Sequence, residues 1–533
     1  MQLVAYGAQD VYLTGNPQIT FFKVVYRRHT NFAVEPIQQV FNGAPDFGRT
    51  VSCNLNRNGD LITNMYAVVS LNDLSDSAGE WSYVRRLGYA LVEETKVEIG
   101  GSKIDEQYGD WLNIWYELSH KVGQERGHAK LVGDSSALTK LADGHPESTL
   151  YIPLIYWFNR FNGLALPLIA LQYHDVRITI QYRKGSECVN HNPIRKAPAV
   201  SMDDSYLLID YVYLDSEERK RFAQASHEYL IEQLQFTGSE TVANNNKYRL
   251  NFNHPSKYLI WAVQSERFSK GNSFLVWADN GDWEAARDKM AKMLVFEAGN
   301  VDPSSVAGVL ANGGTVDPLV PPPKVVGTAG TNSWRDTVLE RNDLTFEDVS
   351  LTLAELDAQY PGEAALTATS YFSGVGTVDP SLTSPVDATT GDVLGVYGVV
   401  ARDWFNYGMN AAGLENPVTA AKLQLNGHDR FQERDGNYFN YVQPYQHFSN
   451  TPADGINVYS FALKPEDHQP SGSCNFSRID NATLNVSVRQ LETTRGSFVA
   501  SNNIASGTIC NIYTVNYNVL RVMSGMAGTA YSN

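Results

Sequence analysis

The residues best suited to chemistry lie close together in residues 466–489, which read EDHQPSGSCNFSRIDNATLNVSVR. Asp467, His468 and Cys474 could belong to a metal site, or Cys474 could be a nucleophile with His468 as its base. The Pro-Ser-Gly sequence between the histidine and the cysteine is typical of a turn, and no glycine-rich oxyanion turn is recognisable. We therefore interpret the stretch as a loop that delivers the strand after it.

Other polar residues lack the spacing that catalysis or metal binding requires. Asp105 and Glu106 are adjacent, and neighbours in a strand face opposite ways, so they do not indicate a glycosidase pair. His120 and His128 do not fit the HExxH pattern, and the sequence contains neither a P-loop nor a GxGxxG motif. We predict that the protein is not an enzyme and has no catalytic residues, no metal and no cofactor.

Asn475, Asn481 and Asn485 match the N-glycosylation pattern and are weak candidates for modification. Asn481 and Asn485 fall at the start of, or within, an alternating strand. The N-terminus lacks the basic start and the apolar run of a secretory signal. We therefore expect these matches to arise by chance.

Composition indicates a large globular chain with reduced cysteines. At 533 residues, 43% of them hydrophobic, two domains or one very large β domain are expected. The four cysteines are far apart and show no CxxC spacing. The most apolar segment, residues 151–173, is interrupted by Asn159, Arg160 and two prolines, so no transmembrane segment is expected.

The formal net charge of −16 is concentrated in one stretch. Residues 279–400 hold about 18 acidic and about 6 basic side chains, a net charge of about −12. The rest of the chain is nearly neutral, and the one basic cluster near an end contains Lys23, Arg27 and Arg28. Because phosphate recognition needs a concentrated basic face, we expect no direct sequence-specific binding of nucleic acid.

The chain reads as two copies of one module of β-strands. Residues 97–113 and 423–440 share a strand, a turn dipeptide, a short polar run, a second glycine, two bulky apolar residues and an asparagine. The alternating strand at 176–182 matches that at 482–488, and Asn-Leu-Asn at 54–56 matches Asn-Phe-Asn at 251–253. The three matches occur in the same order, which indicates duplication.

Two dipeptides predict tight hairpin turns. Gly100-Gly101 and Asn426-Gly427 occupy equivalent places in the two copies. Two-residue hairpin turns need positive φ, which glycine and asparagine tolerate. We therefore expect Gly100, Gly101, Asn426 and Gly427 to be structural residues.

The copies differ by a long insertion. Asn56 and Gly101 are 45 residues apart, whereas Asn253 and Gly427 are 174 apart, so the second copy is longer by 174 − 45 = 129 residues. The excess coincides with the acidic stretch at about 279–400, which we place in a solvent-facing loop. We expect an N-terminal arm at 1–30, a first domain at 31–215 and a second domain at 216–533, with a short helix that Asp215 opens at the boundary.

A second helix is expected to cover one opening of the first domain. Asp110 could cap it, its apolar face would contain Trp111, Ile114, Trp115 and Leu118, and Gly123 would end it. In the second copy, Pro444 should shorten the equivalent helix. Two all-β modules with many alternating strands and hairpins predict two tandem jelly-roll barrels, a double jelly roll with a few short helices.

Several longer stretches resemble one family. They are GAQDVYLTGNPQITFFKVVYRRHTNFA at 7–33, RNGDLIT at 57–63, EIGGSKIDEQYGDW at 98–111, LDSEERKRFA at 214–223 and HQPSGSCNFSRIDN at 468–481. Together they are similar to the major capsid proteins of nucleocytoplasmic large DNA viruses, and they span nearly the whole chain in order. The stretch 279–400 aligns with no family motif.

The resemblance implies a double jelly-roll protein that forms a homotrimer. The trimer would be a pseudo-hexagonal capsomer in an icosahedral virion capsid, assembled in the host cytoplasm around an inner membrane. It would contact neighbouring capsomers and minor capsid and penton proteins, with Lys23, Arg27 and Arg28 as candidate contacts on the inner face. A β-sandwich protein for glycan binding or host attachment is the alternative.

Overall fold

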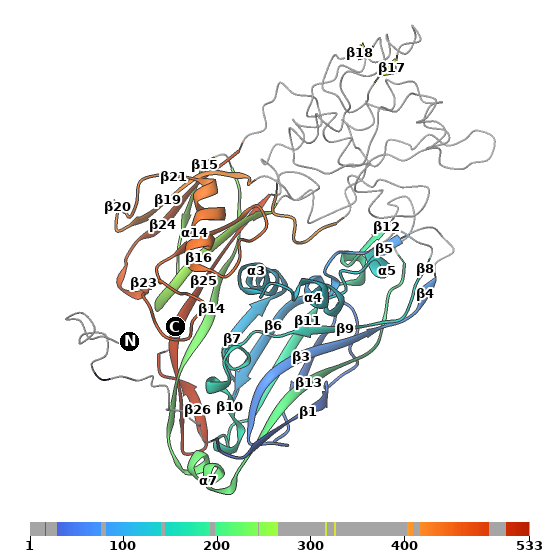
Figure 1. Ribbon diagram of the computed structural model, residues 1–533, viewed down its shortest axis with the longest axis vertical. Helices are drawn as coiled ribbons and strands as arrows, with labels where there is room; N and C mark the ends of the chain where they lie inside the picture. The colour runs from blue at the N-terminus through green and yellow to red at the C-terminus, as the bar shows by residue number, and fades with distance from the viewer. Residues whose placement is uncertain are drawn as a thin grey trace, which may run out of the picture.

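A computed structural model describes residues 16, 29–75, 81–139, 144–191, 198–243, 245–264, 315–316, 325–326, 402–408, 416–489 and 508–531. Lys23, Arg27 and Arg28 lie outside the described residues. So does the acidic stretch 279–400, apart from the paired strands β17 (Thr315–Val316) and β18 (Val325–Val326). The described part is dominated by antiparallel strands in two adjoining bodies (Figure 1).

The first body is a sandwich of two antiparallel sheets. One sheet has the order β1-β13-β3, with β9 and β10 both paired to β3, and the other has the order β2-β11-β6-β7. The bounds are β1 (Phe32–Val40), β13 (Met202–Leu214), β3 (Leu61–Leu71), β9 (Ser148–Pro153), β10 (Leu166–Pro167), β2 (Thr50–Asn54), β11 (Val176–Tyr182), β6 (Val92–Ile99) and β7 (Ser102–Tyr108).

The second body repeats this arrangement. One sheet has the order β14-β25-β16-β22, with β23 paired to β16 and β26 to β25, and the other has the order β15-β24-β19-β20, with β21 paired to β19. The bounds are β14 (His227–Thr241), β25 (Ile509–Met523), β16 (Pro255–Gln264), β22 (Ile456–Ser460), β23 (Cys474–Asn475), β26 (Met526–Thr529), β15 (Asn245–Arg249), β24 (Ala482–Val488), β19 (Val418–Leu425), β20 (His428–Asp429) and β21 (Arg434–Asp435).

The strand orders show that the same fold occurs twice in the chain. β1, β2, β3, β6, β9, β11 and β13 take the places that β14, β15, β16, β19, β22, β24 and β25 take in the second body. In β11 and β24 every second residue is buried, because a strand turns alternate side chains toward the core. The prediction of a double jelly roll is confirmed.

Short elements occupy the loops. The helices are α2 (Leu87–Leu91), α3 (Gly109–Ser119), α4 (Glu125–Leu131), α5 (Ser136–Thr139), α6 (Trp157–Arg160), α7 (Ser216–Gln224) and α14 (Gln443–His447), with single turns η1 (Asn162–Leu164), η2 (Leu168–Ala170), η3 (Gly185–Glu187), η4 (Tyr438–Val442) and η5 (Phe476–Arg478). The short strands are β4 (Leu74–Ser75), β5 (Trp81–Tyr83), β8 (Gly144–His145) and β12 (Val189–His191). No helix in the described part of the chain is long and apolar enough to cross a membrane.

The helix expectations needed correction. Tyr108, not Asp110, precedes α3 as its cap residue, and the helix ends at Ser119 rather than near Gly123. Asp110 lies in the first turn of α3, where burial raises its pKa. In the second copy the α-helix α14 has 5 residues against 11 in α3, as expected; Pro444 lies in its first turn, and the π-helical segment η4 leads directly into it.

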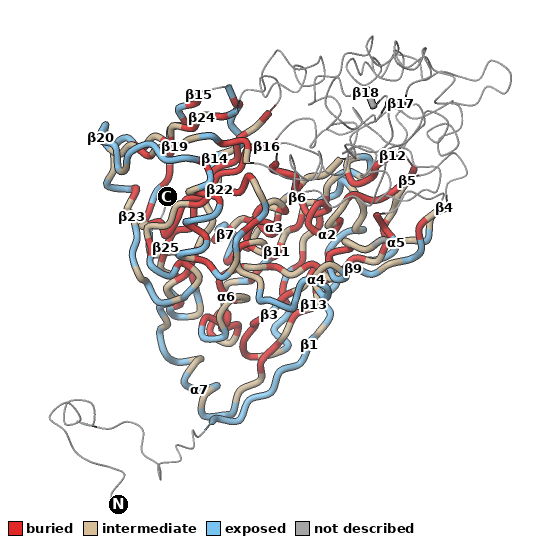
Figure 2. The backbone as a smooth tube through the Cα atoms, turned by 45° about the horizontal axis from the view of Figure 1, so that its top comes forward, coloured by how far each residue is buried: buried red, intermediate tan, exposed pale blue. Residues whose placement is uncertain are grey.

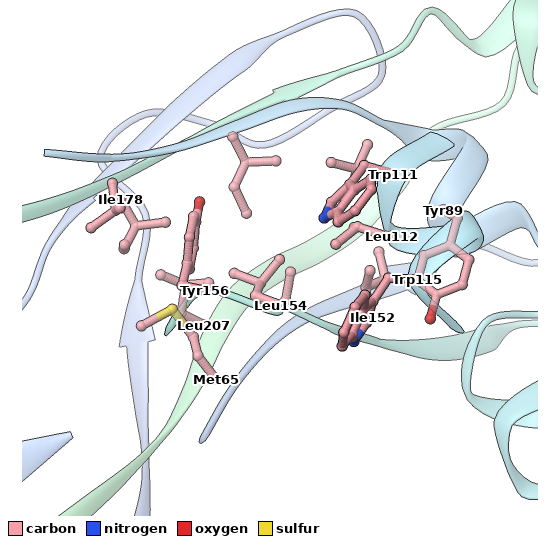
Figure 3. Packing of buried hydrophobic residues seen from close by; sticks show 14 of the residues in the cluster. Met65, Tyr89, Trp111, Leu112, Trp115, Ile152, Leu154, Tyr156, Ile178 and Leu207 are labelled. Carbon is pink, nitrogen blue, oxygen red and sulfur yellow. The ribbon is translucent and has the colours of Figure 1, made fainter. Parts of the chain in front are cut away.

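Each body has its own core, and the first core continues into the second body. Leu259, Trp261 and Ile512 pack inside the second sandwich. Their strand neighbours Tyr258 and Ile260 pack instead with the residues of the first sandwich. Figure 2 shows buried residues in both bodies where they adjoin, and Figure 3 shows Trp111 and Trp115 of α3 in the first core with Leu154 and Tyr156. The two bodies therefore share a continuous apolar interior.

Candidate assembly surfaces

The two dipeptides singled out in the sequence form hairpin turns. Ile99 pairs with Ser102 around Gly100 and Gly101, whose φ values are 59° and 80°. The β19–β20 turn is equivalent, with φ of 52° at Asn426 and 82° at Gly427. At Gly100, an added Cβ would also lie 2.5 Å from the His174 ring. Positive φ at both central residues is the type I′ geometry that matches the twist of the strands.

Gly101→Val and Gly427→Val are each expected to destabilise the protein by about 1–2 kcal/mol, because a β-branched residue is strained at positive φ. Nothing lies within 4 Å of a Cβ built at either position, so steric contact would not add to the cost. Differential scanning calorimetry checks this. Gly528→Val in β26 is the matched control, since that site is also open but lacks positive φ. Equal melting temperatures for all three variants would contradict the strain argument.

The three asparagines of the glycosylation pattern take part in local structure. Asn481 donates its N–H to Asn426 Oδ1 at 3.2 Å, and its carbonyl accepts the Asn426 N–H at 2.7 Å. Asn475 Oδ1 accepts the Ser477 N–H and caps a short turn. The side-chain amide of Asn485 is buried. A glycan at Asn485 would therefore require this part of the sheet to open.

The loop with Asp467, His468 and Cys474 is a packing element. Burial raises the pKa of the Cys474 thiol, which opposes formation of a nucleophilic thiolate. Cys474 belongs to β23 and pairs with Ser256 of β16. The His468 ring centroid lies 5.2 Å from that of Phe161 in the first body. The loop thus attaches to β16 before it leads to β24.

Aromatic side chains fill the junction between the two sandwiches, which we call the seam. The ring of Phe236 on β14 lies 5.0 Å from that of Tyr108 and 4.7 Å from that of Tyr513. Trp111 of α3 approaches Tyr513 at 5.7 Å. The second body thus turns the outer face of its β14-β25-β16-β22 sheet toward α3 and β7 of the first.

A buried ionic cluster lies in the same seam. Glu232 on β14 contacts Arg160 of α6 at 2.8 Å and Lys257 of β16 at 2.7 Å, and its side chain is 2% exposed. The Arg160 guanidinium stacks 3.8 Å above the Trp115 ring. Burial lowers the pKa of Lys257, although Glu232 opposes this effect. One carboxylate thus holds a cation from each body.

Among the described residues, the equivalent sheet face of the first body is only partly covered. In the second body, one cross-strand row that faces the seam is Phe236, Tyr513, Ile260 and Val458. The same row in the first body is Val40, Tyr206, Val68 and Tyr151. Val40 is 69% exposed there, Tyr206 and Tyr151 are half-buried, and Val68 within the row is buried. Figure 2 shows β1 as a largely exposed strand. We call the outer face of this sheet, which contains the row, the free sheet face.

The equivalent helix of the second body is also partly exposed among the described residues. Aligned on their preceding glycines, Gly109 and Gly436, the buried α3 residues Ile114, Trp115 and Leu118 correspond to Tyr441, Val442 and Tyr445. These last three are 38%, 40% and 83% exposed. We call them the free helix face. The duplication found in the sequence aligned the two copies only as far as Asn113 and Asn440. The structure extends the match along the helix and shows that one set is buried and the other is exposed.

One body's sheet face and the other's helix face thus make a contact inside the chain, and the second copy of each face is largely exposed in the part of the chain that the structure describes. Exposed apolar surfaces of this kind mark interaction sites. Two jelly rolls of equal strand order, together with these exposed surfaces, define a structural subunit of the double jelly-roll class. Its exposed faces are suited to contacts with further copies.

Comparisons with known proteins place the chain within this class. Residues 218–528 match the family model of the large eukaryotic DNA virus major capsid protein, and residues 20–215 match that of the major capsid protein N-terminus. The chain is 42% identical to the major capsid protein of Phaeocystis pouchetii virus and 41% identical to capsid protein 1 of Acanthamoeba polyphaga mimivirus, covering 100% of this chain and 99% of each relative.

Solved structures agree with these matches. A quasi-atomic model of the PBCV-1 virus capsid is similar with a TM-score of 0.63 and 32% identity, covering 96% of this chain and 100% of that one. The Faustovirus major capsid protein, at 13% identity, shares the fold with a TM-score of 0.58 over 97% of this chain and 94% of its own.

The chain therefore belongs to the major capsid protein family of large eukaryotic DNA viruses. It is a structural component of the virion that builds the icosahedral capsid, and it is not an enzyme. The family resemblance seen in the sequence is confirmed. The alternative of a glycan-binding or host-attachment protein is not supported, because the matched relatives are capsid proteins.

Proposed function

We propose that the chain forms a homotrimer by placing the free helix face of one copy on the free sheet face of the next. The observation that carries this proposal is the seam, where the equivalent faces, with Trp111 and Tyr513, already pack together. Tyr438 corresponds to Trp111, and Tyr206 corresponds to Tyr513. The contact between copies would therefore repeat the contact within a copy.

A head-to-tail contact of this kind forms a ring when its rotation closes. Three copies that alternate the internal and the external contact place six similar barrels around one axis. The ring then has threefold symmetry but a nearly hexagonal outline. Hexagonal capsomers can contact one another on all sides and tile an icosahedral shell.

Light scattering of the purified protein tests the trimer directly. The expected mass is about three times the 59.1 kDa of the chain. A monomer that persists at high concentration would argue against both free faces as assembly surfaces. A dimer as the largest species would argue against the closed ring.

We infer the other partners from the family and from the charge distribution. We place the acidic stretch 279–400 on the outer surface, where a net charge of about −12 keeps it hydrated. On the inner side, Lys23, Arg27 and Arg28 would meet minor capsid proteins or other acidic surfaces. We further propose that penton proteins contact the chain, that an inner viral membrane lies nearby, and that assembly takes place in the host cytoplasm. We expect no sequence-specific binding of nucleic acid by this chain.

A further inference from the structure

Asp105 is a buried carboxyl that connects the two barrels across the seam. Its side chain is on β7 and is 4% exposed. Oδ1 accepts the backbone N–H of Leu234 on β14 at 3.0 Å, and Oδ2 accepts the side-chain amide of Gln107 at 3.0 Å. The Gln233 amide donates to the Ile104 carbonyl beside it. Asp105 thus fixes β14 of the second barrel against β7 of the first.

A polar cavity of about 500 Å³ runs along this part of the seam. Both barrels line it, and its walls include Asp105, Gln235, Asn253, Asn518 and Tyr531. Because a cavity with polar walls can hold water, it gives protons a route to the seam.

Asp105 differs in its partners from Glu232, another buried carboxyl of the seam. Glu232 contacts Arg160 and Lys257 directly, at 2.8 Å and 2.7 Å. The donors to Asp105 are neutral, namely the backbone N–H groups of Leu234 and Glu106 and the Gln107 amide, and Arg160 acts on it as a more distant charge. A buried carboxylate without a paired cation is costly, whereas a paired one is largely compensated.

We propose that Asp105 binds a proton near neutral pH and that its ionisation weakens the contact between the two barrels. Burial is the dominant effect and raises the pKa of Asp105 to about 7. The Gln107 Oε1 atom is buried without a partner, so the cluster also contains an unpaired acceptor for the proton of a neutral carboxyl. A capsid chain with such a group would hold its barrels together more firmly in mild acid than in mild base.

The ionisable groups that face Asp105 do not reverse this behaviour. They are Glu106 and Tyr108 on its own strand, Tyr156 before α6, and Arg160 in α6, with Glu232 and Lys257 farther along the seam. Burial raises the pKa of Tyr108 and of Tyr156 above the ordinary value, so both stay neutral through neutral pH. Lysine interactions lower the pKa of Glu106 against the effect of burial, so it stays charged.

The direction of the pH dependence follows from linkage. The pKa of Asp105 is higher in the folded chain than the ordinary value of 3.8, so the folded chain keeps a proton that the unfolded chain has already released. The contribution of this group to stability is therefore complete at pH values below about 4. It falls as the pH rises to about 7 and stays low at higher pH.

Asp105→Asn in the full-length protein tests the proposal, because asparagine stays neutral and keeps an acceptor for the Leu234 N–H. Thermal unfolding should be measured from pH 5 to pH 9. The variant is expected to melt above the parent by several degrees at pH 8.5 and within about a degree of it at pH 5. Asp175→Asn, whose side chain is 82% exposed, is the control and should show a constant difference. A difference for Asp105→Asn that does not change with pH would overturn the proposal.

Hydrogen exchange in the unmodified protein gives an answer even where the variant does not fold. After correction for the intrinsic rate, the β14 peptide that contains Leu234 should lose protection between pH 6 and pH 8.5. A peptide from β24, which packs inside the second barrel, should keep its protection. Equal changes in both peptides, or none in β14, would reject a proton-dependent seam.

Discussion

Tyr445→Asp is expected to leave the chain folded and to abolish the trimer. Tyr445 is 83% exposed in the single chain, so the substitution removes little of the packing within it. In the proposed ring, the residue lies under the free sheet face of the next copy. An unpaired carboxylate in such a dehydrated apolar contact costs several kcal/mol, and each 1.4 kcal/mol weakens binding tenfold. Sedimentation or light scattering should therefore show a monomer at concentrations at which the parent is a trimer.

A variant of the opposite surface makes the test specific for a head-to-tail contact. Val40→Asp, on the free sheet face, should also give a monomer, because Val40 is 69% exposed and lies in the row with Tyr206. Each variant retains the face that the other has lost. An equimolar mixture is therefore expected to form a dimer of about twice the chain mass and to stop there. A mixture that stays monomeric, or that restores the full ring, would contradict the proposed pairing of faces.

Val122→Asp is the matched control for both variants. Val122 is 89% exposed, and it lies in the turn after α3, outside the free helix face and the free sheet face. The control should keep the parent mass and the parent melting temperature. Loss of the trimer in this variant would mean that added negative charge alone prevents assembly.

Glu232→Gln is expected to destabilise the protein by about 3–5 kcal/mol, because it leaves two buried cations without their counter-ion. Arg160 and Lys257 come from different barrels, and their side chains are 11% and 0% exposed. The loss should appear in chemical denaturation as a lower midpoint. Replacing all three residues by apolar ones of similar size should recover most of the stability, since the unpaired charges are then gone.

Glu228→Gln on the same strand is the control for the ionic cluster. Glu228 contacts Arg521 at 2.9 Å, but both side chains are more than half exposed. Exposed ion pairs contribute at most about 1 kcal/mol. If Glu232→Gln costs no more than Glu228→Gln, the buried cluster does not hold the seam.

The repeated fold could be predicted from the sequence because its signals are local. Gly100-Gly101 and Asn426-Gly427 specify tight turns whatever surrounds them. The alternation in residues 176–182 and 482–488 reflects burial of one strand face, which any sandwich requires. The order of these signals along the chain was then enough to show duplication and, with the longer motifs, the family.

The seam and the free faces could not be predicted, because they depend on how one barrel sits on the other. Nothing local distinguishes Glu232 from Glu228, yet one is buried between two cations and the other is exposed. Apolar helix residues were expected to cover their own barrel, and Trp111 instead also packs against Tyr513 of the second barrel. Tyr445 has the same sequence character as a core residue, yet it is 83% exposed.

The continuous interior that joins the two barrels also affects the free energy of shell assembly. In the proposed ring, three of the six barrel contacts lie within a chain, so closing the ring requires three molecules to meet instead of six. Each avoided encounter spares the translational and rotational entropy that a free partner would lose, a cost of at least about 4 kcal/mol at a standard concentration of 1 M. In the proposed ring, linking the barrels would therefore lower the affinity that each contact between copies needs at a given protein concentration.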